Sequence, residues 1–170
     1  MAVFIALLRA INVGGTGMLP MKELSALCTE LGLEKVRTYI QSGNVVFESR
    51  LSEEKVRAAL EKALAERMRK TIDVMVRTAA ELRSVLEANP FPDAQPAKVA
   101  VVFRSGPAPK GLLDNLVIPG GEEVRLGKRE IYIHYPDGMG RSKLRLSSAV
   151  GVVTVRNINT VAKLVAMTFA

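Results

Sequence analysis

The segment from Val36 to Glu48, VRTYIQSGNVVFE, constrains the fold more than any other part of the sequence. Threonine, tyrosine, isoleucine, valine and phenylalanine favour strands, and Ser42-Gly43 is a turn pair. Glycine adopts positive φ without steric cost, so the chain can reverse within two residues. The segment therefore predicts a β-hairpin. Gln41, Ser42 and Asn44 crowd its turn with amide and hydroxyl groups, which can satisfy the turn's own backbone or hold a ligand.

Periodic apolar segments on both sides of this hairpin predict further elements. Ala2–Leu8 is almost continuously apolar, as a central strand covered on both faces would be. Pro20 suits the first turn of a helix, and Gly32 is expected to end that helix in a left-handed cap. The other expected features are an apolar face of Leu24, Leu27, Cys28 and Leu31 on this helix, a second helix that Ser52 caps and that buries Val56, Leu60, Ala63 and Leu64, and a strand over Thr71–Val76.

A linker and a second series of elements follow. Thr78-Ala-Ala-Glu81 is a capping box that begins a short helix, and Asn89-Pro90, Pro92 and Pro96 mark a boundary. The elements expected after it are a strand over Lys98–Phe103, a short helix over Gly111–Leu116, a hairpin of Glu123–Leu126 and Glu130–Tyr135 about a Gly127-Lys128 turn, a helix over Arg141–Val150, a strand over Val152–Val155, and a helix over Asn159–Met167 with Val161, Leu164 and Val165 facing inward.

Both series run strand, helix, strand, strand, helix, strand, which is the ferredoxin-like pattern. We therefore predict an α+β chain of two tandem ferredoxin-like (βαββαβ) subdomains with antiparallel sheets, plus a linker helix and a C-terminal helix. The N-terminal subdomain is placed at residues 1–77, the linker helix and proline-rich boundary at 78–97, and the C-terminal subdomain at 98–170.

Composition narrows the partners. The formal net charge of +7 and the isoelectric point near 9.8 favour an acidic partner such as nucleotide or nucleic acid. The single cysteine, Cys28, excludes an internal disulfide and fits a cytoplasmic protein. The apolar opening is too short to span a bilayer and lacks the basic leader of a signal peptide, so no membrane partner is expected.

Two motifs near the N-terminus carry a family resemblance. The run LLRAINVGG (Leu7–Gly15) and the run VRTYIQSGNVVF (Val36–Phe47) resemble the domain of unknown function 1697 family, and GRSKL (Gly140–Leu144) and TVRNINTVAKL (Thr154–Leu164) are similar to its closing motifs. The resemblance implies two ferredoxin-like subdomains in a bacterial cytoplasmic protein, and no established activity. Ala10 stands where the family usually has glycine, and Ile158 where it usually has tryptophan. If that tryptophan stacks on a ligand in relatives, this chain has lost the contact.

The loop after the first strand is a candidate anion site formed by Arg9, Asn12, Gly14 and Gly15. Adjacent glycines let backbone N–H groups approach a ligand, and a loop that enters a helix N-terminus favours anions. Arg9 can add a bidentate contact to phosphate or carboxylate. Neither GxxxxGK[ST] nor GxGxxG is present, however. The alternative is a strand-to-helix turn whose arginine and asparagine brace the hairpin.

The region from Arg125 to Arg156 is strongly basic and supplies the other candidates, Arg141, Ser142, Lys143, Arg156 and Asn157. Aromatic residues on a neighbouring strand suggest a platform for stacked bases. Tyr132 and Tyr135 are an odd number of residues apart, though, so an unbroken strand places them on opposite faces. This spacing favours a solvated basic face instead.

Catalytic signals are weak. The chain has one histidine, His134, and Cys28 lies on the apolar face of a helix, where a thiol is usually inert. No cluster has metal-ligand spacing, so the sequence predicts no metal and no cofactor. We expect a non-catalytic binding module for an anionic, phosphate-bearing ligand such as nucleotide or nucleic acid. Two alternatives stay open: an enzyme of unknown reaction with a site between the subdomains, and a structural protein that forms a homodimer.

Overall fold

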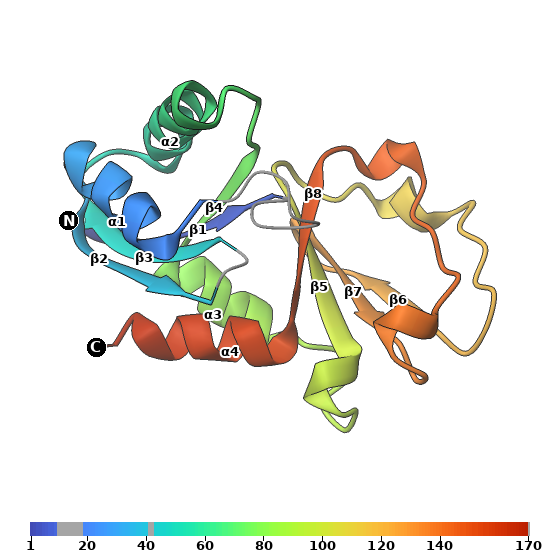
Figure 1. Ribbon diagram of the computed structural model, residues 1–170. Coiled ribbons are helices and arrows are strands. Elements are labelled where there is room, and N and C mark those ends of the chain that lie inside the picture. The colour runs from blue at the N-terminus through green and yellow to red at the C-terminus, as the bar shows by residue number, and fades with distance from the viewer. Residues whose placement is uncertain (10–18, 41–42, 170) are drawn as a thin grey trace. The chain divides into compact units, whose positions relative to one another are not determined.

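The computed structural model describes residues 1–9, 19–40 and 43–169 of the chain (Figure 1). The chain divides into two units. The first combines Met1–Arg83 with the C-terminal residues Leu164–Ala170, and the second is Ser84–Lys163. The subdomain boundaries at 77 and 98 stay a prediction. Among the described residues, no helix combines the length and the apolar character that crossing a bilayer requires.

The first unit has the predicted element order. Its elements are β1 (Ala2–Leu8), α1 (Met21–Glu30), β2 (Glu34–Tyr39), β3 (Asn44–Ser49), α2 (Glu53–Met68) and β4 (Val74–Thr78), followed by α3 (Ala79–Glu87), which begins in this unit. The four strands form one antiparallel sheet in the order β2-β3-β1-β4. This is the strand order of the split crossover pattern, so the predicted fold class is confirmed here.

Local signals explain where these elements begin and end. The Ser52 side chain accepts a hydrogen bond from the Lys55 backbone N–H and caps α2. Gly32 follows α1 with a φ of +83°, the left-handed conformation expected after a helix. Thr78 and Glu81 form the predicted capping box at α3, because each side chain accepts a hydrogen bond from the other's backbone N–H.

The hairpin between β2 and β3 is present, but its turn is longer than predicted. β2 ends at Tyr39 and β3 begins at Asn44, which leaves four residues between the strands and not two. Ile40 and Gly43 both have positive φ, of 47° and 80°. A second left-handed residue ahead of the glycine lets the chain reverse more gradually than a two-residue turn would.

Helices α1 and α2 cover one face of the first sheet (Figure 1). Leu24 and Cys28 from α1 and Leu60 from α2 pack with alternate residues of the strands, including Phe4 and Phe47. The two phenylalanine rings stack with their centroids 5.9 Å apart. The apolar faces predicted for both helices are therefore the main core of this unit.

The second unit repeats the sheet. Its elements are the end of α3, η1 (Pro96–Lys98), β5 (Val99–Arg104), η2 (Lys110–Leu113), β6 (Glu123–Leu126), β7 (Glu130–His134), η3 (Met139–Arg141), η4 (Ser148–Val150), β8 (Val153–Asn157) and the start of α4 (Ile158–Met167). The strands form an antiparallel sheet in the order β6-β7-β5-β8, which matches the first sheet strand for strand. The predicted α+β class with two tandem antiparallel sheets is thereby confirmed.

The connections of this second sheet differ from the prediction. The helix expected over Arg141–Val150 is wrong: between η3 and η4 the chain is extended. The helix expected over Gly111–Leu116 is reduced to the short 3₁₀ turn η2. Leu144 and Leu146 are two residues apart, which is the period of extended chain and not of a helix. The hairpin turn is also one residue longer than predicted, since Gly127–Arg129 separate β6 from β7.

The last helix is as predicted. α4 begins after Asn157, whose side-chain oxygen accepts a hydrogen bond from the Thr160 backbone N–H. Val161, Leu164 and Val165 are buried. The C-terminal end of the helix belongs to the first unit, where the Arg37 guanidinium donates a hydrogen bond to the Met167 carbonyl oxygen.

Candidate ligand-binding site

The candidates of the first unit are described only in part. Asn12, Gly14, Gly15, Gln41 and Ser42 lie outside the described residues. The Arg9 guanidinium lies 4.0 Å from an Asp73 carboxylate oxygen, and the Arg9 backbone N–H donates to the Asp73 carbonyl oxygen. Asn44 is fully buried, and its amide donates to the Tyr39 carbonyl oxygen at 3.0 Å. Both described side chains therefore contact protein groups next to the turn and the strand end.

Arg156 and Asn157 also contact protein groups. The Arg156 guanidinium is buried on β8 and donates to the Thr154 hydroxyl at 2.7 Å and to the Val155 carbonyl oxygen at 2.9 Å. Burial lowers the pKa of this guanidinium to about 10. Asn157 caps α4. In the first unit, Arg77 holds the matching position, one residue before the cap of α3, and is also buried. A buried arginine before a cap is thus common to both sheets.

The aromatic residues of the second unit form no exposed platform. The Tyr132 hydroxyl donates to the Val85 carbonyl oxygen at 2.7 Å, and burial raises the pKa of this tyrosine. Tyr135 is buried in the apolar cluster on the other face of the sheet. The prediction that the two tyrosines lie on opposite faces is confirmed. Bases therefore have no tyrosine ring here on which to stack.

His134 and Cys28 have surroundings that explain them structurally. The His134 ring lies 5.6 Å from the Phe91 ring, and its Nδ1 atom is 3.8 Å from a Glu123 carboxylate oxygen. Cys28 is buried in the first unit, and desolvation raises the pKa of its thiol to about 12. Within the described residues, no group of three or more His, Cys, Asp or Glu side chains is arranged to hold a metal ion.

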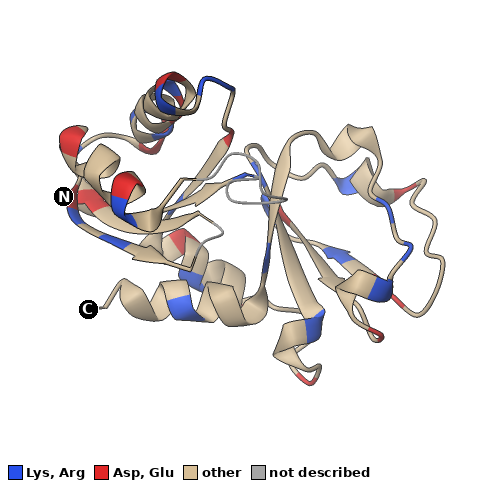
Figure 2. Cartoon of the chain, viewed as in Figure 1, with Lys and Arg blue, Asp and Glu red and all other residues tan. Residues whose placement is uncertain are grey.

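The segment Arg141–Ser147 of the second unit alternates between inward and outward residues. Leu144 is buried and Leu146 half-buried, whereas Arg141, Lys143 and Arg145 are exposed. Alternate residues of extended chain lie about 6.6 Å apart along it. Three cations therefore follow one side of this segment, and Figure 2 shows basic residues along the second unit. No ion pair joins these three side chains to a carboxylate among the residues that the structure describes.

Ser142 lies on the inward side of the same segment and fixes its position. Its hydroxyl donates to the Glu122 carboxylate at 2.9 Å and accepts a hydrogen bond from the Leu144 backbone N–H. The Glu122 carboxylate also accepts a hydrogen bond from the Gly120 backbone N–H. The hydrogen bond from Ser142 is the main reason that the pKa of Glu122 is lowered, so this carboxylate is charged at neutral pH. The hydroxyl of Ser142 is a structural contact that joins the 120–122 turn to the basic segment.

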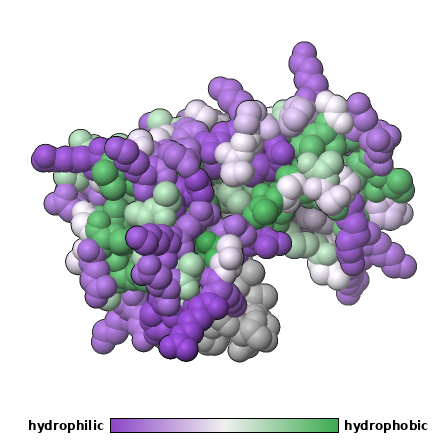
Figure 3. Space-filling model, turned by 90° about the horizontal axis from the view of Figure 1, so that it is seen from above, coloured by the Kyte–Doolittle hydropathy of each residue, from purple (hydrophilic) through white to green (hydrophobic). Residues whose placement is uncertain are grey.

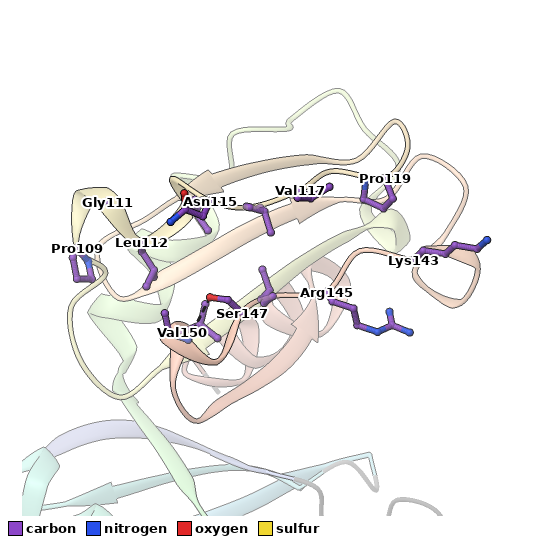
Figure 4. Close-up of a pocket in the computed structure, with 14 residues that line it drawn as sticks. Pro109, Gly111, Leu112, Asn115, Val117, Pro119, Lys143, Arg145, Ser147 and Val150 are labelled. Carbon is purple, nitrogen blue, oxygen red and sulfur yellow. Dashed lines mark hydrogen bonds between the residues drawn. The ribbon is translucent and has the colours of Figure 1, made fainter.

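A pocket of about 670 Å³ lies beside this segment, within the second unit. One wall comes from Pro109–Pro119, which contains η2, and the other from Lys143–Val150 (Figure 4). The lining is mainly aliphatic and includes Leu112, Leu113, Leu116, Val117, Leu146 and Val150. Lys143 and Arg145 lie at the end near Pro119, with their charged groups directed outward (Figure 4). The pocket therefore pairs an apolar interior with a cationic end.

The pocket occupies the face of the sheet that α1 and α2 cover in the first unit. Its half-buried leucines pack against the cluster formed by Ala100, Val102, Ile131 and Ile133. η2 lies in the connection between β5 and β6, as α1 lies between β1 and β2, and η3 and η4 lie where the first unit has α2. Short turns shield less of a sheet than helices do, and the space that they leave is the pocket.

Comparison with known proteins places the chain in a family. A family model described as a protein of unknown function, DUF1697, matches residues 1–132. The chain belongs to this family. It is also similar in structure to the conserved bacterial protein SP0830 from Streptococcus pneumoniae, with a TM-score of 0.80, 26% sequence identity and coverage of 98% of each chain. No curated protein matches the chain.

The match to the DUF1697 model ends inside β7, so it includes only one of the two walls of the pocket. The wall from Pro109 to Pro119 lies within the matched residues, and the wall from Lys143 to Val150 lies after them. The structural similarity to SP0830 covers both walls, because it spans almost the whole chain. The pocket is therefore built on a fold that SP0830 shares.

The sequence predicts only part of this site. Lys143 lines the pocket, and Arg141 and Ser142 lie directly before it. Arg145 was missed, although the alternation of RSKLRLS already indicates that Arg145 shares a side with Arg141 and Lys143. The sequence does not indicate that the leucines of the opposite wall line a pocket, because apolar residues in a predicted helix are expected to belong to the core. Nothing in the described residues brings Arg156 or Asn157 to this pocket.

Proposed function

We propose that this protein is a non-catalytic binding module for an anionic ligand, including a phosphate-bearing one, and that the pocket of the second unit is its site. The observation that carries the proposal is the position of Lys143 and Arg145 at one end of a 670 Å³ pocket. Pockets of this size suit small ligands, and a few polar groups at an apolar pocket fix the ligand's orientation. Two cations favour an acidic group on the ligand.

Charge around the pocket supports this proposal. The described lining contains no aspartate or glutamate, and the Glu122 carboxylate beside it accepts hydrogen bonds from Ser142 and Gly120. Lys143 and Arg145 are exposed, so an incoming anion meets them without first breaking an ion pair inside the pocket. The net charge of +7 adds long-range attraction for anions, which is strongest at low ionic strength.

The test is a titration of the full chain with inorganic phosphate, AMP and a labelled single-stranded oligonucleotide at low and at physiological salt. The probe variant replaces Lys143 and Arg145 by glutamine. The control replaces Lys62 and Arg50, which are exposed residues of the first unit, by glutamine and changes the net charge equally. We expect at least one of these anions to bind, with affinity at least about tenfold lower in the probe variant and nearly unchanged in the control.

The salt dependence identifies the kind of anion. A steep linear fall of log affinity with log salt indicates many phosphate contacts and therefore a nucleic acid. A shallow dependence with saturation at one equivalent indicates a small ligand in the pocket. Equal binding by the probe and control variants would show that only the overall charge matters, and the site would be wrong.

A further inference from the structure

The side chains that line the pocket indicate which part of a ligand can enter it. The walls are formed by leucine, valine and proline, and among the described lining residues there is no aromatic side chain. Proteins that bind bases stack them on aromatic rings or on arginine planes. Here the only arginine of the lining, Arg145, points outward at one end (Figure 4). Aliphatic walls suit an aliphatic chain better than a flat base.

The interior of the pocket continues the apolar cluster of the second unit. Leu112, Leu116 and Leu146 line the pocket and also pack against that cluster. At the outer edge, Val117 is 78% exposed. Figure 3 shows hydrophobic residues at the surface of this unit beside hydrophilic side chains. A ligand chain placed here would remove apolar surface from water along its length, as a helix does in the first unit.

The charges at the cationic end fit a small acidic group such as a carboxylate. Lys143 and Arg145 contribute two positive charges, and Glu122, held by Ser142 directly before Lys143, contributes one negative charge. Arg141, on the same side of the segment, adds a third positive charge, so the local sum is +2, from three minus one. A carboxylate is attracted to this end without bringing excess negative charge, whereas a triphosphate would bring excess negative charge close to the Glu122 carboxylate.

From these observations we propose that the ligand is a free aliphatic monocarboxylate in solution. Its chain lies along the leucine walls, and its carboxylate lies at Lys143 and Arg145. This proposal rests on the function proposed above and names the ligand class of the same pocket. The aliphatic part of the ligand supplies affinity through its burial, and the carboxylate fixes the ligand's orientation. Neither part alone is therefore expected to bind as tightly as the whole ligand.

The experiment titrates the full chain with acetate, hexanoate, octanoate, decanoate and decanol, below micelle-forming concentrations, by calorimetry. AMP and inorganic phosphate are titrated in parallel. We expect affinity to rise from acetate to decanoate, by up to about fourfold for each methylene that is fully buried. Decanoate is expected to bind more tightly than decanol, and Lys143→Gln is expected to weaken decanoate but not decanol.

Two neighbouring substitutions test the pocket itself. Val117→Gln places an amide in the lining, and Ile118→Gln makes the same change at the next residue, which does not line the pocket. Both side chains are well exposed, so both variants are expected to fold, with unchanged circular dichroism. Val117→Gln should weaken decanoate at least about threefold relative to Ile118→Gln. Equal affinities in these two variants would overturn the assignment of the aliphatic chain to this pocket.

The other outcomes separate the two proposals. Binding of AMP or phosphate that depends on Lys143, together with decanoate no tighter than acetate, would refute the aliphatic ligand and leave the anion site standing. Absence of binding by every anion would refute both. Association with phosphatidylglycerol vesicles without decanoate binding would show that a membrane surface, and not a free aliphatic carboxylate, is the partner.

Discussion

The two units contain the same sheet and cover it differently. In the first, α1 and α2 bring Leu24, Leu60 and Leu64 onto the sheet and complete a buried core. In the second, short turns and extended chain bring half-buried leucines onto the matching face, and a pocket remains. The comparison teaches that strand order specifies the architecture, whereas the connecting segments decide whether one face becomes a core or a pocket.

The largest expected difference between the units comes from shortening one leucine in each. Leu60→Ala removes a fully buried side chain from α2 and should lower the free energy of unfolding by about 3 kcal/mol, within a usual range of 2 to 5. Leu112→Ala removes a half-buried side chain beside an existing pocket and should lower it by less than about 1 kcal/mol. Urea unfolding followed by circular dichroism measures both. Equal losses would mean that the leucine walls are as tightly packed as the first core.

The hairpin of the second unit depends on a close contact. A Cβ atom on Gly127 would lie 2.9 Å from a ring carbon of Tyr132, and Tyr132 is held by its hydrogen bond to Val85. Gly127→Ala should therefore destabilise the protein by roughly 1 to 3 kcal/mol. Gly106→Ala is the control, because its Cβ would meet no atom within 4 Å. Thermal unfolding of the two variants tests the contact, and a Gly127→Ala variant as stable as Gly106→Ala would contradict it.

The two helix caps are a point on which the units are alike. Thr78→Ala and Asn157→Ala should each lower the free energy of unfolding by about 1 kcal/mol, since each leaves a helix N–H without its side-chain acceptor. Thr78→Ala should have the larger effect, because Thr78 and Glu81 act reciprocally. Thr78→Ser keeps the acceptor and serves as the control in urea unfolding. If Thr78→Ser lowers the free energy of unfolding as much as Thr78→Ala does, the loss comes from the threonine methyl group and not from the hydrogen bond.

The last expected effect is a pH dependence that arises in the first unit. The pKa of Cys28 is about 12 in the folded protein and about 9.0 for an unburied thiol, so the native state keeps a proton that the unfolded chain releases above pH 9. This contribution to stability is complete below pH 9 and is lost as the pH rises towards 12. The stability advantage of the wild type over Cys28→Ala should shrink over that interval in denaturant titrations. A constant advantage would show that the thiol is not desolvated as the structure indicates.

The accuracy of the predictions from sequence also differs between the two units. Periodicity predicted the first unit's elements because Leu24, Cys28, Val56 and Leu60 lie at helical spacing on faces that are indeed buried. It failed at Arg141–Val150, where the alternation of Leu144 and Leu146 carried the true period. The cations of the sequence predict one side of the candidate site. They do not predict the leucine wall, because a pocket forms where the connecting segments leave part of a sheet uncovered, and no single residue encodes that.

The return of the chain's last residues to the first unit has a consequence for synthesis on the ribosome. Arg37 binds the Met167 carbonyl oxygen, and the Arg83 guanidinium lies 4.7 Å from the centre of the Phe169 ring. These contacts form only after residues 167–169 have been translated, whereas the second unit is one continuous stretch, Ser84–Lys163. The N-terminal unit, although made first, is therefore completed last. Contacts between residues so distant in sequence slow folding, so the first unit is expected to gain its last contacts after the second unit has been synthesised.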